Sequence, residues 1–313
     1  MVHQKTMSAV VSLLLFIFLT SPILCWANTN AGDDLFPVIL TDDLGIKITI
    51  TKKPERIVST APNNTEIIFA LGLEDKLVGR TDFCNYPPGV EKIESIGMLS
   101  PLNLEKIVSL EPDLILTFGG LQAKDIIRLR ELGYKVLALD AETLSEMLNN
   151  IEIIATACGV PEKGKELITN LKERIDFIAT SSADIPASQR LKVFTGSSYE
   201  AIWSPGKDTL FDDLITLAGG QNIAGNQKGW VTISSEQVAL AEPDVIIITS
   251  GIMNPEEIDK MKDDVIRHPG WSQIPAIKKN HIFAANEDLF YRAGPRLVEG
   301  LELLYEIFSG IKE

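Results

Sequence analysis

Cysteine and histidine are scarce in this sequence, which argues against a disulfide framework or a metal site. The 313 residues contain three of each. Cys84 and Cys158 have a spacing that fits no metal-binding or redox motif. We expect two unpaired thiols, although an oxidising compartment would permit a bridge between them. Beyond the N-terminal region only His268 and His281 remain, too few for the converging ligands of a zinc or manganese receptor.

Basic residues are in deficit as well, which argues against nucleic acid as a partner. The chain has 29 Lys and Arg against 43 Asp and Glu, a formal net charge of −14 at pH 7. Phosphate contacts need clustered Lys and Arg, and an anionic lipid surface repels so acidic a chain. We therefore expect a soluble acidic carrier that binds neither nucleic acid nor a membrane surface.

Long apolar runs are absent except near the N-terminus, where the sequence has the features of a secretory signal. A basic start precedes the apolar run 10–19, and residues 25–27 place small side chains at the −3 and −1 positions of a cleavage site. The run is shorter than the ~20 residues of a spanning helix. We expect residues 1–27 to be a cleaved signal peptide that directs the chain to the periplasm. Lipid attachment at Cys25 is the alternative, which Leu24 disfavours because lipoprotein signals carry a small residue there.

Enzyme motifs are missing too. The sequence has no nucleophile elbow, no phosphate-binding loop and no Ser/His/Asp set in a matching context. We therefore expect no catalytic residues, no bound metal and no cofactor. The chain is interpreted as a binding protein and not as an enzyme.

The chain does contain a regular alternation of strands and helices, which indicates α/β layers. Asn63, with Glu66 three residues later, predicts a capped helix that Gly72 ends. Short apolar and β-branched runs predict seven strands, near residues 56–60, 77–80, 113–118, 135–139, 191–195, 245–249 and 281–284.

The middle of the chain predicts one long helix. Pro161 suits a first helical turn, and the breaker-rich segment 181–189 ends the pattern. One stripe of the helix is apolar, with Leu167, Leu171, Ile175 and Ile178. About twenty helical residues span ~30 Å, the width of a small domain. We predict three parts after the signal peptide: an N-terminal lobe over 28–160, a connecting helix over 161–182 and a C-terminal lobe over 183–313.

Two segments repeat one pattern at a distance of 131 residues. Residues 104–117 read LEKIVSLEPDLILT, and residues 235–248 read SEQVALAEPDVIII. Each follows a helix-capping residue, Asn103 or Ser234, and each contains a proline that ends the helix before a buried strand. Any α/β unit can share part of this pattern. The shared cap, acid, proline and strand together favour two similar lobes.

Six segments of the sequence carry a resemblance to a known family. They are RIVSTAPNNTEIIFALGL (56–73), VGRTDFCNYPP (78–88), LNLEKIVSLEPDLIL (102–116), LAGGQNIA (217–224), ISSEQVALAEPDVIIIT (233–249) and FYRAGPR (290–296). Together they resemble the substrate-binding proteins of cobalamin and iron-siderophore ABC importers, a class whose two lobes are joined by one helix. The resemblance runs from about residue 54 to the C-terminus, and it leans toward cobalamin-binding members through the TDFCNYPP, W-x5-E and D-x-F-x-R-A patterns.

This resemblance implies a fold and a function. The fold is α/β, with two similar lobes that have central, mainly parallel sheets, one long backbone helix and a ligand cleft between the lobes. The function is capture of a cobalamin (corrinoid) as cargo in the periplasm and its delivery, by a monomer, to an inner-membrane ABC permease dimer. A ferric siderophore or haem is the alternative, since anionic chelates often bind Arg or Lys, and Arg80, Arg292 and Arg296 could supply them.

The resemblance also implies which residues bind the ligand. Flat aromatic rings with a few polar groups suit the broad, partly apolar face of a corrinoid. Phe83 stands where the family can have Tyr, and Leu99 replaces an aromatic contact, a departure that leaves the ligand less certain. The candidates are Pro62, Phe83, Leu99, Trp203, Trp230, Asp288, Phe290, Tyr291 and Arg292.

Alternative interpretations exist for three of these side chains. Trp203 and Trp230 could be core residues, but Ser-Pro-Gly after the first and glycines before the second predict loops, where function concentrates. Arg292 could simply pair with Asp288 on a surface turn. We predict a place in the cleft for all three.

Glu105 and Glu236 occupy equivalent positions in the repeat, each two residues after its helix cap. A carboxylate there is favoured by the helix dipole, by about 0.3–1 kcal/mol, and this could be its whole role. The resemblance implies instead that both glutamates dock into basic pockets of a two-fold symmetric permease. We predict a docking role because the duplicated placement is what a two-fold partner requires.

Overall fold

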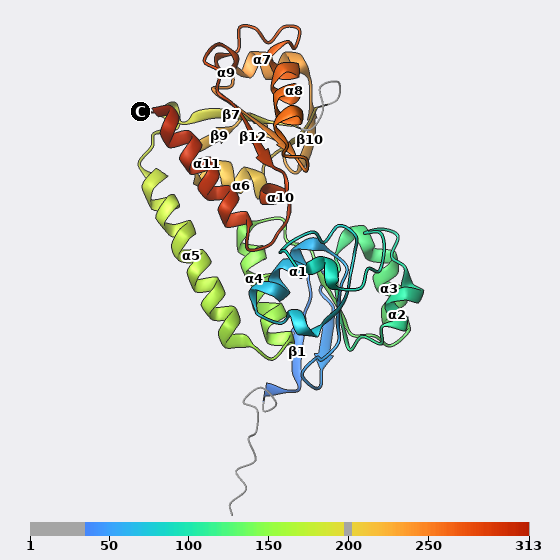
Figure 1. Cartoon of the computed structure of the whole chain (residues 1–313). Coiled ribbons are helices and arrows are strands. Elements are labelled where there is room, and N and C mark those ends of the chain that lie inside the picture. The colour runs from blue at the N-terminus through green and yellow to red at the C-terminus, as the bar shows by residue number, and fades with distance from the viewer. Residues whose placement is uncertain (1–34, 197–201, 313) are drawn as a thin grey trace, which may run out of the picture.

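A long helix joins two α/β lobes in the computed structural model, which describes residues 35–196 and 202–312 (Figure 1). The predicted signal peptide, with Cys25, lies outside the described residues. Within those two ranges, none of the helices combines the length and the apolar character that crossing a membrane requires.

The N-terminal lobe is built on a parallel sheet with the strand order β4-β3-β5-β6. These strands are β3 (Ile57–Ser59), β4 (Leu77–Arg80), β5 (Leu114–Phe118) and β6 (Val136–Leu139). They are almost wholly apolar because helices cover both faces of the sheet. One face packs on α1 (Pro62–Ala70) and α4 (Leu144–Ala157), and the other on α2 (Leu104–Ser109) and α3 (Ala123–Glu131). An antiparallel pair, β1 (Val38–Thr41) and β2 (Lys47–Ile50), packs beside α4.

The C-terminal lobe repeats this plan with a parallel sheet in the order β12-β11-β7-β9. Its strands are β7 (Leu191–Thr195), β9 (Gly220–Asn222), β11 (Val245–Ser250) and β12 (Ile282–Asn286). One face packs on α6 (Leu210–Leu217) and α11 (Leu297–Lys312), and the other on α7 (Ser235–Ala241), α8 (Pro255–Ile266) and α9 (Pro275–Lys278). A short helix, α10 (Asp288–Tyr291), follows β12. An antiparallel ribbon of β8 (Ile202–Pro205) and β10 (Trp230–Ile233) completes the lobe.

The seven predicted strands are all present, within two residues at each end. The β1–β2 pair, the short strand β9 and the β8–β10 ribbon were not predicted. Single 3-10 turns occur at Glu74–Lys76, Val90–Lys92, Gly120–Gln122 and Ala187–Gln189.

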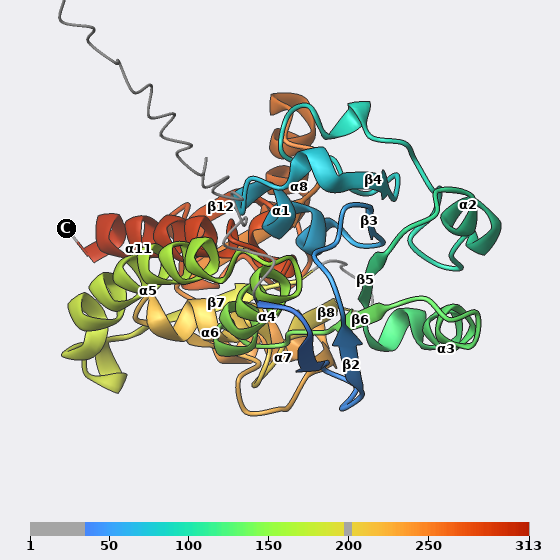
Figure 2. The ribbon, with the colours of Figure 1, turned by 90° about the horizontal axis from the view of Figure 1, so that it is seen from below.

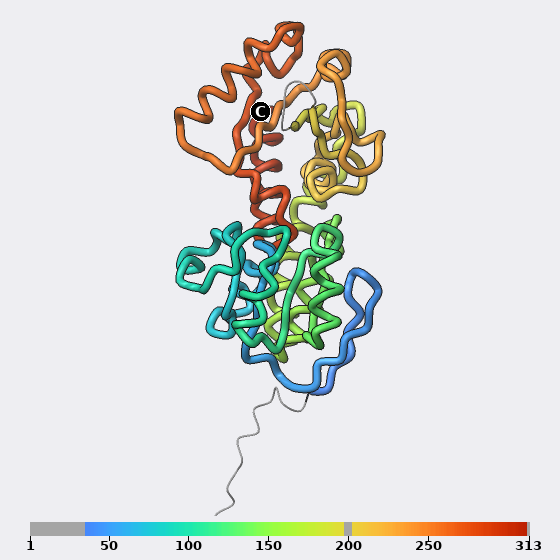
Figure 3. The backbone as a smooth tube through the Cα atoms, turned by 90° about the vertical axis from the view of Figure 1, so that its right-hand side faces the viewer, coloured from blue at the N-terminus to red at the C-terminus, as the bar shows by residue number. Residues whose placement is uncertain are grey.

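Helix α5 (Pro161–Ala183) is the long helix that the sequence predicts. It packs against α4 in the N-terminal lobe and against α6 and α11 in the C-terminal lobe. Figure 2 shows α5 and α11 side by side along one edge of the molecule. One hydrophobic core, which includes Ile67 of α1 and Leu304 of α11, continues through both lobes. The lobes lie one above the other (Figure 3), and this core forms an apolar seam between them.

The repeated sequence pattern corresponds to a repeated structure. Asn103 caps α2 by accepting a hydrogen bond from the Lys106 amide, and Ser234 caps α7 in the same way through the Gln237 amide. After each helix a glutamate adopts a left-handed conformation, Glu111 with φ 47° and Glu242 with φ 49°. The prolines that follow these glutamates disfavour the right-handed helical conformation there, so the two helices end within one residue of equivalent positions.

The predicted cap at Asn63 is wrong. Helix α1 starts at Pro62, with Ala61 as an N-cap that makes no side-chain hydrogen bond. Proline suits this first position because its missing N–H needs no partner there, so the helix starts earlier than expected. Glu66 does not bond back to the cap but pairs with Arg296. The end of the helix is as predicted, because Gly72 has φ +64°.

Candidate functional site

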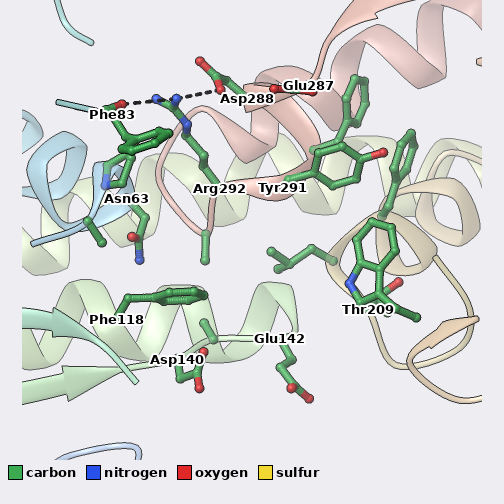
Figure 4. Close-up of a pocket in the computed structure, with 18 of the residues that line it drawn as sticks. Asn63, Phe83, Phe118, Asp140, Glu142, Thr209, Glu287, Asp288, Tyr291 and Arg292 are labelled. Carbon is green, nitrogen blue, oxygen red and sulfur yellow. Dashed lines mark hydrogen bonds and ion pairs between the residues drawn. The ribbon is translucent and has the colours of Figure 1, made fainter. Parts of the chain in front are cut away.

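A cavity of about 510 Å³ is lined by both lobes. Part of its wall comes from residues at the carboxyl ends of the parallel strands. Phe118 ends β5, Asp140 follows β6, and Glu287 follows β12. Open α/β sheets bind ligands at this edge. Figure 4 shows Phe118 and Asp140 on one side of the cavity and Tyr291 on the other.

Aromatic rings form a connected wall in the C-terminal lobe. The Trp230 and Tyr291 rings are 5.4 Å apart, and Tyr291 meets Phe211 edge-on at 5.7 Å. Phe211 stacks on Phe290 at 4.4 Å, and both of these rings are fully buried. The Tyr291 hydroxyl lies 2.9 Å from the hydroxyl of Thr249. The buried rings thus support the outer rings, of which Trp230 is 46% exposed.

Phe83 faces this wall from the N-terminal lobe and is 44% exposed. Its loop is held across the lobe boundary by Arg292, which donates to the Asn85 Oδ1 atom at 2.7 Å and to the Phe83 carbonyl at 3.4 Å. Arg292 also pairs with Asp288 at 2.8 Å. Figure 4 shows the guanidinium between Phe83 and Asp288. Arg292 therefore both pairs with Asp288 and lies on the cavity wall, so the two alternatives expected for this side chain occur together.

The charge of the cavity is strongly negative. Arg292 is the one basic side chain among the described residues that line it. The carboxylates on the wall are Asp140, Glu142, Asp208, Glu287 and Asp288. Asp288 is neutralised by Arg292, and Asp208 lies 3.5 Å from the exposed Lys228. The Asp140 carboxylate accepts a hydrogen bond from the Gly120 amide at 2.8 Å. Asp140, Glu142 and Glu287 remain, so acidic side chains line the cavity together with the aromatic wall.

The structure brings eight of the nine candidate ligand residues to this cavity. Trp203 is the exception, since it is not among the lining residues. It lies on β8 opposite Thr232 of β10, on the same face of the ribbon as Trp230, and is 51% exposed. Ligand contact by these residues stays a prediction.

The predicted loops around the two tryptophans are wrong. Trp203 lies within β8, and Trp230 is the first residue of β10. Pro205 ends β8 and Gly229 precedes β10, so these breakers mark the ends of paired strands. A two-stranded ribbon buries little of its outer face, which is why its sequence lacks the apolar pattern of a core strand.

Other residues of the wall were not predicted. Phe118, Phe211 and the acids Asp140 and Glu287 lie at the cavity without belonging to a quoted motif. A signal was present for Asp140, because it directly follows the strand predicted over 135–139. Glu287 follows β12 directly, but it lies three residues after the strand predicted over 281–284. Phe211 gave no such signal, since it lies on a helix whose apolar stripe also forms the core.

The predicted docking residues are exposed and lie outside the cavity. Glu105 is in the first turn of α2 in one lobe, and Glu236 is in the first turn of α7 in the other. A hydrogen bond with the Ser234 side chain, and one with its own amide, lower the pKa of Glu236. Its carboxylate therefore stays ionised to a lower pH than that of an ordinary glutamate.

Both cysteines within the described ranges, Cys84 and Cys158, are free and buried. Burial raises the pKa of the Cys158 thiol to about 12, so it is protonated and unreactive at neutral pH. In residues 35–196 and 202–312, no group of three or more His, Cys, Asp or Glu side chains is placed to hold a metal ion.

Comparison with known proteins places this geometry in a family. The model of a family described as "Periplasmic binding protein" matches residues 57–289. An ABC transporter substrate-binding lipoprotein of Bacillus subtilis, YvrC, is 36% identical over 278 residues, covering 87% of this chain and 86% of YvrC. A vitamin B12-binding protein of Photorhabdus laumondii is 30% identical over 253 residues, with 80% of this chain and 86% of the relative covered.

Solved structures share the fold. The periplasmic vitamin B12-binding protein BtuF of Vibrio cholerae superposes with a TM-score of 0.71 and 26% identity, covering 83% of this chain and 98% of BtuF. The periplasmic haem-binding protein RhuT of Roseiflexus gives a TM-score of 0.72, also with 26% identity, over 83% of this chain and 99% of RhuT.

Proposed function

Because the chain belongs to the periplasmic binding proteins that serve ABC importers, we propose that it captures a cobalamin-type corrinoid and delivers it to the permease. Proteins of this family bind and hand over solutes outside the cytoplasm and catalyse no reaction. Family membership gives this protein a solute-binding role in an ABC importer. The identity of its ligand and the delivery of that ligand to the permease are what we propose.

The observation that carries the choice of ligand is the charge of the cavity. A haem or a ferric siderophore brings anionic groups, which five carboxylates and one paired guanidinium oppose. A corrinoid brings a broad apolar ring edged with neutral amides. Carboxylates accept hydrogen bonds from amide N–H groups, and flat aromatic side chains pack on the ring. The acidic side chains and the aromatic wall of the cavity thus suit the amide edge and the flat ring of a corrinoid.

The three arginines that could have bound an anionic chelate are already engaged. Arg80 does not line the cavity and donates to the carbonyl groups of Val90 and Thr81. Arg296 forms a bidentate pair with Glu66, and Arg292 pairs with Asp288. To bind Arg292 or Arg296, an anionic ligand would have to displace the carboxylate that already pairs with that arginine. The relatives described as vitamin B12-binding support the same choice.

We propose export through residues 1–27 to the periplasm. Lipid attachment at Cys25 is the alternative, and the Bacillus relative is itself described as a lipoprotein. The intact mass of the exported protein separates a chain that begins after Ala27 from one that carries lipid on Cys25.

Titration of the exported, ligand-free protein with cyanocobalamin tests the ligand. We expect a single site, detected by calorimetry and by a change in the corrinoid absorbance spectrum. Haem and a ferric catecholate, titrated under the same conditions, should give no saturable binding. Saturable binding of either anionic chelate without binding of cyanocobalamin would overturn the proposal.

A further inference from the structure

A buried ion pair joins the two lobes beside the cavity. Arg296 precedes α11 in the C-terminal lobe and donates from Nε to Glu66 Oε2 at 3.0 Å and from Nη2 to Oε1 at 2.6 Å. Glu66 lies on α1 of the N-terminal lobe and is 4% exposed, while Arg296 is 9% exposed. Two parallel charge-assisted hydrogen bonds fix both the distance and the angle between their partners.

Neither member of this pair lines the cavity, but both touch residues that do. Arg292 Nη1 lies 3.6 Å from Glu66 Oε1, and Asp288 Oδ2 lies 3.7 Å from Arg296 Nη2. With the Arg292–Asp288 pair, two arginines and two acids form one neutral cluster. The Arg296 guanidinium also stacks on the ring of Tyr86, 3.8 Å from its centroid. The cluster therefore has an outer pair on the cavity wall and an inner pair behind it.

The backbone near the cluster allows this close approach. Position 294 is a glycine, and a Cβ atom there would lie only 3.2 Å from Glu66 Oε2. The segment between Asp288 and Arg296 can therefore lie directly against α1. Through Arg292 the same segment also holds the loop that carries Phe83. One short segment thus lines the cavity and bonds to two parts of the opposite lobe.

Stability alone does not explain such a pair. Removing two charges from water is costly, and buried ion pairs can often be replaced by apolar side chains without loss of stability. Burial raises the pKa of Glu66, and the hydrogen bonds and charge of Arg296 offset part of that rise. What the pair supplies, and apolar side chains do not, is a defined geometry between the lobes.

We propose that Glu66 and Arg296 are positioning residues, an interlobe clamp that fixes the angle between the lobes and so places Arg292 and Phe83 for the ligand. The clamp works together with α5. The shared hydrophobic core holds the lobes together without a preferred direction, because the hydrophobic effect is non-directional, whereas the bidentate pair fixes both a distance and an angle beside the cavity. The effect on affinity rests on the proposed function, because it requires that the cavity binds the corrinoid.

The test replaces the clamp by apolar side chains of similar length, Glu66→Met with Arg296→Met. The chain offers a matched control, Arg174→Met with Glu302→Met. Arg174 of α5 and Glu302 of α11 form an equally bidentate pair, at 2.7 and 2.6 Å, away from the cavity. Spin labels on Lys124→Cys of α3 and Asp264→Cys of α8, both exposed, report the distance between the lobes. The buried Cys84 and Cys158 do not take up label.

We expect the clamp variant to broaden the interlobe distance distribution of the ligand-free protein and to raise the Kd for cyanocobalamin at least tenfold. The control variant should change neither quantity. If the clamp variant does not fold, Arg296→Lys is used instead. It keeps the positive charge but cannot form the two parallel hydrogen bonds of the guanidinium, and it should show both effects in weaker form. A folded clamp variant with an unchanged distance distribution and Kd overturns the proposal. If the wild-type protein binds no cyanocobalamin, the proposed function fails, and the distance distribution still decides the clamp.

Discussion

Single aromatic side chains determine how the cavity can contact a flat ligand. Trp230 is the cavity-lining ring of the β8–β10 ribbon, and it contacts Tyr291, whose hydroxyl is anchored on Thr249. A ring that is half exposed in the free protein and supported from behind can pack on a flat ligand without rearrangement. Little ordering free energy is then lost on binding.

Trp230→Ala should weaken corrinoid binding while the protein stays folded. Losing an anchoring aromatic costs about 2–4 kcal/mol, which is roughly a thirtyfold to a thousandfold rise in Kd. Calorimetry gives the Kd, and the melting temperature reports the fold. Phe177→Ala is the control, because Phe177 is 66% exposed on α5 and lies away from the cavity. Trp203→Ala measures how far along the ribbon the ligand extends. A lower melting temperature with an unchanged Kd would place Trp230 in the core.

Two short helices, α2 and α7, repeat one local design in the two lobes. Each begins at a side-chain cap, places a glutamate in its first turn and ends at a left-handed glutamate before proline. Neither first-turn glutamate contributes to the cavity. Because the repeat places an exposed acid at the same position of both lobes, as a two-fold symmetric partner would require, we propose that Glu105 and Glu236 dock on the two halves of the permease.

Replacing Glu105 and Glu236 together by Lys should abolish transport and leave the Kd for the ligand unchanged. Like charges facing a basic surface cost several kcal/mol, and two linked contacts lose more than either alone. Uptake into vesicles that contain the importer is the measurement. The matched control, Glu162→Lys with Glu256→Lys, makes the same charge change at exposed first-turn positions of α5 and α8. Normal uptake by the Glu105→Lys, Glu236→Lys variant would mean that these two glutamates only stabilise their helices.

The whole molecule is built to move little. A single hydrophobic core runs through both lobes, and α5 packs against helices of each. A hydrogen bond from the Leu144 amide at the start of α4 to Asp213 of α6 also crosses between the lobes. Bending the molecule would open this seam and expose apolar surface to water, which is unfavourable by roughly 25 cal/mol per Å².

X-ray scattering should therefore give nearly superimposable profiles with and without saturating cyanocobalamin. The expected change in radius of gyration is small because the lobes already share a core before ligand arrives. Ligand-free protein at the same concentration serves as the reference. A clear decrease in the radius of gyration on binding would identify α5 as a hinge and contradict this prediction.

The elements of this protein were predictable because their signals are local. Seven strands, the long helix from Pro161 and the two capped helices follow from apolar periodicity, proline and capping residues that act within a few positions. The failures at this level were also local. Pro62 is the first residue of α1, so the helix begins before the cap that was expected at Asn63. The proline and glycine residues beside Trp203 and Trp230 suggested loops, but they flank a paired two-stranded ribbon without a buried outer face.

The chemistry of the site required the tertiary structure. Family resemblance named nine candidate residues, eight of which line the cavity, but the acidic side chains beside them come from the ends of strands and from loops far apart in the chain. The net charge of −14 does not say where those acids gather. Glu66 was interpreted as part of a helix cap, and its partner Arg296 is 230 residues away. Local patterns fix which segments form helices and strands, whereas only the packing of the two lobes decides which charges meet across them.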